Sequence, residues 1–147
     1  MQRNDPESQP TRTSSARPVG VLVVDDVEGV RNVLAAGLQQ YGFTVWLARN
    51  GFEALDLYQS HSASIDMLLL DVLVPDRDGP QTLADIQQFD PDVRACFLTG
   101  CSGQHSVESL LDCGAIAVFR KPVRFGELAE RLVELMARPT DAVGSCA

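Results

Sequence analysis

Five short apolar runs punctuate the chain at regular intervals. They cover residues 19–24, 43–48, 65–70, 93–98 and 115–119. The first, Val-Gly-Val-Leu-Val-Val, is apolar at every position rather than at every second one. Continuous runs of this kind are typical of parallel strands that are covered on both faces. The pattern therefore predicts five buried strands.

Helical periodicity fills the intervals between these runs. The expected helices cover residues 27–41, 51–60, 80–89, 104–113 and 125–137. Apolar residues expected to face the core are Val30, Val33, Leu34 and Leu38 in the first helix, Ala54, Leu55 and Leu57 in the second, and Leu128, Leu132, Val133, Leu135 and Met136 in the last. Asp26 and Asn50 are candidate helix caps, Pro80 suits a first helical turn, and Gly42 and Gly114 are expected to end helices. Strands that alternate with helices predict an α/β fold, a doubly wound parallel sheet with right-handed crossovers.

Composition and charge narrow the class of protein. The chain has 147 residues, 45% hydrophobic and 22% charged, which is ordinary for one globular domain. Its net charge of -8 argues against direct nucleic-acid binding, since phosphate recognition needs a basic face. The four cysteines have no metal-ligand spacing, and no segment has the length of a signal peptide core or a membrane span. We expect a cytoplasmic protein without membrane contact, with a disordered leader over residues 1–18, a folded domain over 19–137 and a flexible tail over 138–147.

Polar residues with related chemistry follow four of the predicted strands. They are Asp25 and Asp26, then Asp71, then Thr99, then Lys121. In an open parallel sheet the ligand crevice lies outside the carboxyl ends of the strands, so these side chains are expected to meet at one edge. Clustered carboxylates suit a hard cation such as Mg²⁺, and the hydroxyl and the ammonium then suit an anionic group. A phosphoryl group on one of the aspartates would satisfy both requirements.

Four segments, taken together and in order, resemble the receiver domain of two-component response regulators. They are residues 23–26 with Arg31, residues 70–79 (Leu-Asp-Val-Leu-Val-Pro-Asp-Arg-Asp-Gly), Leu98-Thr99-Gly100, and Phe119-Arg120-Lys121-Pro122. The resemblance covers about residues 19 to 137. It implies a flavodoxin-like sheet with strand order 2-1-3-4-5 and five helices.

The resemblance also implies a role for each matching residue. Asp71 is the implied phospho-acceptor, with Thr99 as the switch hydroxyl and Lys121 as the cation that pairs first with carboxylate and then with phosphate. Asp26, Asp71 and the backbone carbonyl of Leu73 are the implied direct Mg²⁺ ligands, with Asp25 acting through a metal-bound water. The implied phosphoryl donor is a histidine kinase or a phosphotransfer protein. The implied output is contact with a downstream protein through the face of the fourth helix, fifth strand and fifth helix.

Two departures from the family pattern bear on the mechanism. The family often has an aromatic residue three positions before the lysine, where this chain has Val118 followed by Phe119. Alternation along a strand means that Phe119 cannot replace it. Leu73 and Cys101, which would flank the phosphoryl group, are both rather apolar.

Other interpretations stay open for single residues and for the whole chain. An Asp at a strand end is often a cap or turn residue, a Lys before Pro is often solvated, and Thr-Gly is often a turn. We expect Asp76 and Asp78 to be turn formers and Arg31 to be a surface helix residue. The chain would catalyse only its own phosphorylation and dephosphorylation, as a single-domain regulator or the receiver of a larger protein. The alternatives are a pseudo-receiver that binds partners without phosphorylation and, from a third class, a Mg²⁺-dependent phosphohydrolase.

Overall fold

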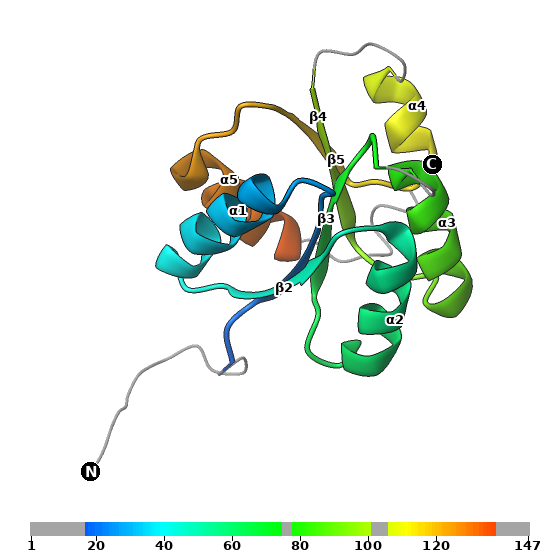
Figure 1. Cartoon of the computed structure of the whole chain (residues 1–147), viewed down its shortest axis with the longest axis horizontal. Helices are drawn as coiled ribbons and strands as arrows, with labels where there is room; N and C mark the ends of the chain where they lie inside the picture. Colours follow the sequence, from blue (N-terminus) through cyan, green and yellow to red (C-terminus); the bar gives the residue numbers. More distant parts are fainter. Residues whose placement is uncertain (1–16, 75–77, 101–105, 138–147) are drawn as a thin grey trace.

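The computed structural model describes residues 17–74, 78–100 and 106–137. Strands and helices alternate along the whole of this part of the chain (Figure 1). The strands are β1 (Gly20–Val24), β2 (Thr44–Ala48), β3 (Met67–Asp71), β4 (Ala95–Thr99) and β5 (Ala117–Arg120). The helices are α1 (Glu28–Gln40), α2 (Gly51–His61), α3 (Gly79–Phe89), α4 (Val107–Asp112) and α5 (Phe125–Met136). The predicted order of elements is confirmed.

The five strands form one parallel sheet in the order β2-β1-β3-β4-β5, as predicted. Helices α1 and α5 cover one face of the sheet, and α2, α3 and α4 cover the other (Figure 1). Because successive side chains of a strand point to opposite faces, the sheet divides the core in two. Leu68 and Leu70 pack in the cluster with α2 and α3, whereas Met67 and Leu69 pack in the cluster with α1 and α5. This double coverage explains why the strand sequences are apolar throughout.

One predicted helix cap and one predicted turn residue differ from the structure. Asp26 does not cap α1, because Val27 occupies the N-cap position and makes no side-chain cap hydrogen bond. The Val27 N–H donates instead to Asp25 Oδ1 at 3.0 Å. The Asp26 side chain is exposed to solvent. Asp78, expected to be a turn former, is the N-cap of α3 and accepts from the Gln81 N–H at 2.9 Å. The prediction for Asp76 lies outside the described residues.

The other predicted helix boundaries agree more closely. Asn50 caps α2 by accepting from the Glu53 N–H at 2.8 Å, and Pro80 lies in the first turn of α3. Gly42 and Gly114 follow α1 and α4 with φ of 91° and 108°, a backbone conformation that favours glycine. The expected start of the fourth helix at residue 104 lies outside the described residues, and α4 begins at Val107 with Ser106 as its cap.

Two apolar residues expected to face the core do not. Val33 on α1 and Val133 on α5 keep 58% and 55% of their surface exposed. Ala35 and Ala129 are buried in the same helices. Adjacent positions on a helix are about 100° apart, so a residue beside the buried stripe can face solvent even when it is apolar.

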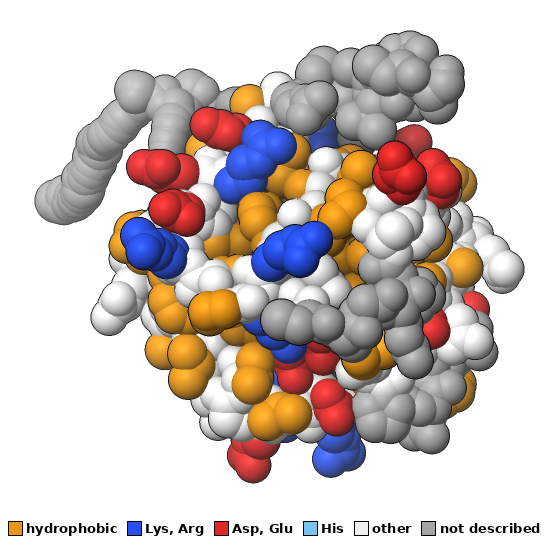
Figure 2. All heavy atoms as spheres, turned by 90° about the horizontal axis from the view of Figure 1, so that it is seen from above, with side chains coloured by type: hydrophobic (Ala, Val, Ile, Leu, Met, Phe, Trp, Pro, Cys, Tyr) orange, Lys and Arg blue, Asp and Glu red, His pale blue; other side chains and the backbone are white. Residues whose placement is uncertain are grey.

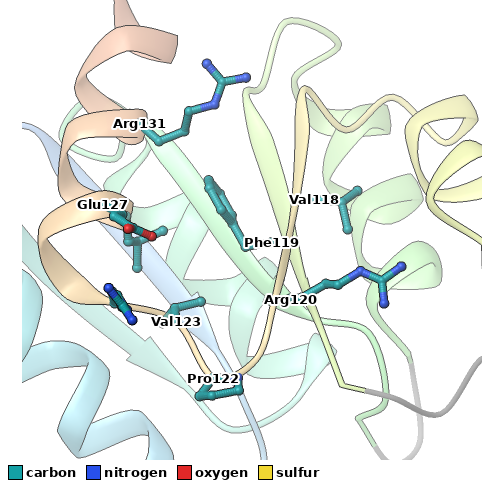
Figure 3. A pocket seen from close by; sticks show the side chains of 9 residues that line it. Val118, Phe119, Arg120, Pro122, Val123, Glu127 and Arg131 are labelled. Carbon is teal, nitrogen blue, oxygen red and sulfur yellow. The ribbon is translucent and has the colours of Figure 1, made fainter.

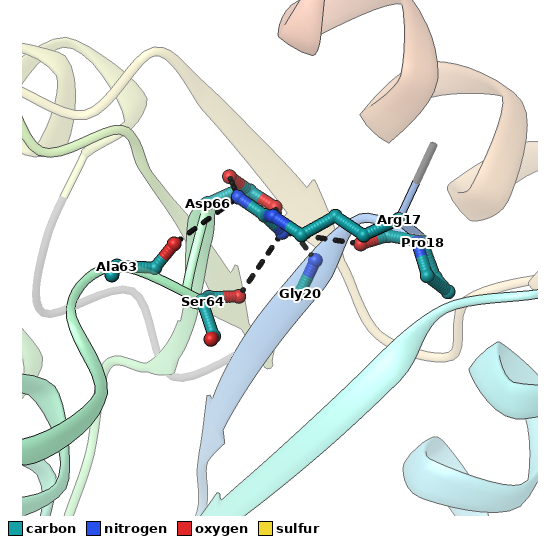
Figure 4. Close-up of polar contacts among 6 residues, drawn as sticks. All are labelled: Arg17, Pro18, Gly20, Ala63, Ser64 and Asp66. Carbon is teal, nitrogen blue, oxygen red and sulfur yellow. Dashed lines mark hydrogen bonds and ion pairs between the residues drawn. The ribbon is translucent and has the colours of Figure 1, made fainter. Parts of the chain in front are cut away.

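Arg17 ties the start of the described chain to the amino-terminal end of the sheet (Figure 4). Both of its terminal nitrogens donate to the Asp66 carboxylate at 2.7 Å, and Asp66 Oδ2 also accepts from the Gly20 N–H at 2.8 Å. Arg17 belongs to the segment expected to be a disordered leader. Residues 1–16 of that segment, and the expected flexible tail over 138–147, lie outside the described residues. No helix in the described ranges has both the length and the apolar character that a membrane crossing needs.

Candidate functional site

The carboxyl ends of three strands bring the predicted acidic and basic side chains together. Asp25 directly follows β1, Asp71 is the last residue of β3, and Lys121 directly follows β5. Backbone hydrogen bonds to the neighbouring strands hold Asp25 and Lys121 in place. The Asp25 N–H donates to the Ala48 carbonyl at 3.1 Å, and the Lys121 N–H donates to the Thr99 carbonyl at 2.9 Å. The site therefore lies where the sheet topology predicts it.

Three carboxylates form a compact cluster at this edge. Asp25, Asp26 and Asp71 each offer an oxygen, and these oxygens all lie within 4.8 Å of one another. Asp25 is fully buried at 0% exposure and Asp71 is 8% exposed, whereas Asp26 lies open to solvent. Carboxylates this close repel one another unless a cation compensates them.

Lys121 supplies part of that compensation. Its ammonium donates to Asp25 Oδ2 at 3.1 Å and to Asp71 Oδ1 at 3.3 Å. Burial, and then repulsion from Asp25, raise the pKa of the Asp71 carboxyl above its ordinary value despite the opposing attraction of Lys121. Burial acts to lower the pKa of the Lys121 ammonium, but attraction to Asp71 and hydrogen bonding to Asp25 outweigh it, so that pKa is raised.

Arg31 supports the site in a way that the sequence analysis missed. Its guanidinium donates to the backbone carbonyl of Asp25 at 2.9 Å, so the residue is more than a surface helix side chain. Together with the Val27 N–H on Asp25 Oδ1, this contact fixes both the backbone and the carboxylate of Asp25. The sequence signals for this contact are its place six residues after Asp25, near the start of a helix, and its membership of the first segment that carries the family resemblance.

The remaining predicted residues flank the cluster. Thr99 ends β4, and its hydroxyl donates to the Gly100 carbonyl at 3.3 Å. Leu73 lies two residues beyond β3 with an exposed side chain, and Cys101 lies outside the described residues. Val118 packs with the α2–α3 side of the core and Phe119 with the α1–α5 side. The expected alternation therefore holds, and Phe119 does not take the place of an aromatic at position 118.

The donor set of the cluster fits Mg²⁺. All three side chains offer hard oxygen ligands, which Mg²⁺ prefers, and the open position of Asp26 gives access from solvent. A space-filling view onto this edge of the sheet shows red acidic and blue basic side chains close together, with orange hydrophobic side chains beside them (Figure 2). Charge and apolar surface are thus combined on one face.

Comparison with known proteins identifies the family. Residues 21–133 match the response regulator receiver domain, so the chain belongs to this family. Response regulator MprA of Mycolicibacterium vanbaalenii is 36% identical over 132 residues, which are 88% of this chain and 56% of MprA. Transcriptional regulatory protein ZraR of Klebsiella oxytoca is 32% identical over 123 residues, which are 84% of this chain and 27% of ZraR. The chain thus spans about half or less of the length of these relatives.

Solved structures agree with the fold. A chain of the CheX–CheY–BeF3–Mg²⁺ complex from Borrelia burgdorferi superposes with a TM-score of 0.79 at 26% identity, covering 86% of this chain and 96% of that one. A response regulator receiver domain protein from Clostridium thermocellum gives a TM-score of 0.77 at 25% identity, covering 82% and 95%. Receiver domains are signalling domains of two-component systems rather than ordinary enzymes, and they bind Mg²⁺ at an acidic cluster of the kind formed by Asp25, Asp26 and Asp71.

Proposed function

We propose that this chain is a phosphorylation-dependent switch in which Asp71 accepts a phosphoryl group from a histidine kinase or a phosphotransfer protein. The observation that carries the proposal is the contact of Lys121 with Asp71 at 3.3 Å beside two further carboxylates. A carboxylate can act as a nucleophile toward phosphorus, and phosphoryl transfer asks the protein mainly for positioning and charge neutralisation.

The transfer step uses Asp71 and Lys121, which are already in contact. A carboxylate oxygen of Asp71 bonds to the phosphorus of a phosphohistidine while the P–N bond breaks, and the imidazole leaves with the electron pair and takes up a proton. The Lys121 ammonium, which pairs with the Asp71 carboxylate before transfer, would pair with the phosphoryl oxygens after it. Thr99, at the end of the neighbouring strand, offers a hydroxyl donor once it turns from Gly100 toward the new anion.

We assign the metal-binding roles from the availability of oxygens. Both oxygens of Asp25 already accept hydrogen bonds, one from the Val27 N–H and one from Lys121, which supports an indirect role through a metal-bound water. Asp26 is exposed and Asp71 lies beside it, so these two, with the Leu73 carbonyl, are the proposed direct ligands. Bound Mg²⁺ would neutralise the charge that builds up on the transferred phosphoryl group.

An apolar cleft next to the site is the proposed docking surface for the donor protein. The cleft has a volume of about 820 Å³, and its lining includes Val27, Val30, Leu34 and Phe125. Lys121 lines the same cleft, so a protein seated there would lie beside the acidic cluster. Since its phosphohistidine must reach Asp71, the donor has to cover surface that adjoins Lys121.

The proposal is tested with a small-molecule donor, since no protein partner is then needed. The full chain is incubated with acetyl phosphate, with and without Mg²⁺, and its phosphorylated fraction is followed on phosphate-affinity gels. We expect a retarded band that requires Mg²⁺ and is lost on chelation before the donor is added. A chain that never shifts would favour a pseudo-receiver, a protein-interaction module that works without phosphorylation.

A further inference from the structure

Arg31 contacts the acidic site without pairing with any of its carboxylates. Its guanidinium donates at 2.9 Å to the backbone carbonyl of Asp25, and it forms no ion pair with a carboxylate of the described residues. This carbonyl belongs to the peptide group that joins Asp25 to Asp26. A single contact therefore holds the link between two of the three clustered carboxylates.

The start of α1 directs the Arg31 side chain toward this peptide group. Arg31 is the fourth residue of α1, and its N–H donates to the Val27 carbonyl at 3.0 Å, so its backbone is fixed at the start of the helix. Side chains on a helix lean toward its amino terminus. A long side chain at this position can therefore extend past the start of the helix to a carbonyl six residues earlier.

The Asp25 carbonyl depends on this contact. Asp25 is fully buried, and no backbone N–H of the described residues donates to its carbonyl. A buried carbonyl without a donor is unfavourable, so we expect the peptide group to rotate toward water if Arg31 is lost. Such a rotation would move the side chains of Asp25 and Asp26 together, because both residues are attached to that peptide group.

Asp26 depends on this peptide group more than Asp25 does. The Val27 N–H and the Lys121 ammonium hold the two carboxylate oxygens of Asp25 independently of Arg31. The Asp26 side chain is exposed and accepts no hydrogen bond from a described residue. The direction of the Asp26 carboxylate is therefore set mainly by its backbone, which Arg31 holds through the Asp25 carbonyl.

We propose that Arg31 is a positioning residue for the metal site, and that it holds the Asp25–Asp26 peptide group so that both carboxylates face the ion. The inference rests on the proposed function for the identity of the ion, Mg²⁺. Removing a group that orients metal-binding residues commonly weakens metal affinity about 10–100-fold. The charge of Arg31 acts in the opposite direction, because a cation near the cluster repels Mg²⁺. Positioning and charge therefore predict opposite results when Arg31 is replaced.

Mg²⁺ titrations of the full chain, followed by amide chemical shifts, separate the two effects. Arg31→Met removes both the hydrogen bond and the charge, whereas Arg31→Lys keeps a cationic donor on a side chain of similar length. We expect Arg31→Met to weaken Mg²⁺ binding about tenfold, and Arg31→Lys to recover part of this loss. In the metal-free protein, Arg31→Met should also shift the Asp26 amide signal, because the peptide group that carries this amide is no longer held.

A matched control removes a cation from the same edge of the sheet without touching Asp25. Arg120 ends β5 and is exposed, and in Figure 3 its side chain extends from the strand on the side away from α5. Arg120→Met should change the Kd for Mg²⁺ by no more than about twofold, because salt screens exposed charges. Melting temperatures confirm that each variant is folded.

Three outcomes would overturn the inference. Tighter Mg²⁺ binding by Arg31→Met would show that Arg31 acts only through its charge. An unchanged Kd beside a lower melting temperature would make Arg31 a residue of the fold alone. An equal loss of affinity in Arg120→Met would remove the special role of the Asp25 carbonyl. A wild-type chain that binds no Mg²⁺ would overturn both this inference and the metal-binding roles of the proposed function.

Discussion

Replacing Lys121 by Met should cost the metal-free protein far more stability than an ordinary surface substitution. The ammonium lies 3.1 Å from Asp25 and 3.3 Å from Asp71, and its side chain is 31% exposed. At an effective dielectric constant of about 20, each contact is worth about 5 kcal/mol before desolvation is subtracted. Removing one partner of a buried pair typically costs about 3–5 kcal/mol. Since Lys121 is partly exposed, we expect a loss of about 2–3 kcal/mol.

The pH dependence of this loss follows from the raised pKa of Asp71. Without Lys121, burial and Asp25 remain to raise that pKa, and the attraction that opposed them is gone. A carboxyl whose pKa is higher in the folded than in the unfolded state loses stability as the pH rises between the two values. The difference in the free energy of unfolding between wild type and variant should therefore be small in acid, grow as the pH rises between the two pKa values, and reach its full size above them.

Urea unfolding in the presence of a chelator measures the effect. The matched control is Arg49→Met, which removes a cation 3.6 Å from Glu53 in a pair whose side chains are 69% and 39% exposed. This control should lose no more than about 0.5 kcal/mol. If Lys121→Met is as stable as Arg49→Met at neutral pH, Lys121 does not compensate the acidic cluster and the electrostatic reasoning fails.

Three further predictions probe the metal site, the packing behind Asp71 and the core. Asp26→Asn should raise the melting temperature of the metal-free protein, because it removes one charge from the cluster of three carboxylates. It should also reduce the stabilisation by Mg²⁺, which is worth about 2.7 kcal/mol when Mg²⁺ is at a hundredfold excess over its Kd. An unchanged response to Mg²⁺ would count against Asp26 as a ligand. Gly79→Ala would bring a Cβ to 2.8 Å from the Asp71 carbonyl oxygen and should destabilise the protein by about 1–3 kcal/mol. Gly29→Ala, whose Cβ would have no atom within 4 Å, should stabilise the protein by about 0.5–1 kcal/mol. Both are measured by thermal unfolding, and equal effects would refute the packing argument. Burial raises the pKa of the Cys96 thiol to about 12, so this residue should resist alkylation until the protein unfolds, and rapid labelling of the native state, mapped by mass spectrometry, would contradict its burial.

The strands and the acidic cluster could be predicted because topology alone decides them. An apolar run without alternation signals a strand buried on both faces, and five of them joined by helices leave few arrangements. Asp25, Asp71 and Lys121 come from distant parts of the sequence, yet all follow strands whose carboxyl ends share an edge. Their meeting required no knowledge of side-chain packing.

The contacts that depend on packing could not be predicted. Periodicity predicts the apolar stripe of α1, but the edge of the buried part of that stripe depends on how the helix is rotated against the sheet. Val33 lies outside the buried part. Arg31 reaches a backbone carbonyl, which carries no residue-specific signal. The sequence around Asp78 predicts a turn residue because turns and N-caps favour the same short polar side chains, and only the position of the helix boundary distinguishes the two.

The most direct test of the central claim is the site of phosphorylation itself. Three proteins are incubated with acetyl phosphate and Mg²⁺, and their intact masses are measured by mass spectrometry. They are the wild-type chain, Asp71→Asn, and Asp56→Asn as a control at an exposed carboxylate. Borohydride reduction of the aspartyl phosphate before proteolysis then locates the modified residue. We predict a gain of one phosphoryl group in wild type and in Asp56→Asn, located at Asp71, and no gain in Asp71→Asn. A gain of wild-type extent in Asp71→Asn would contradict the account.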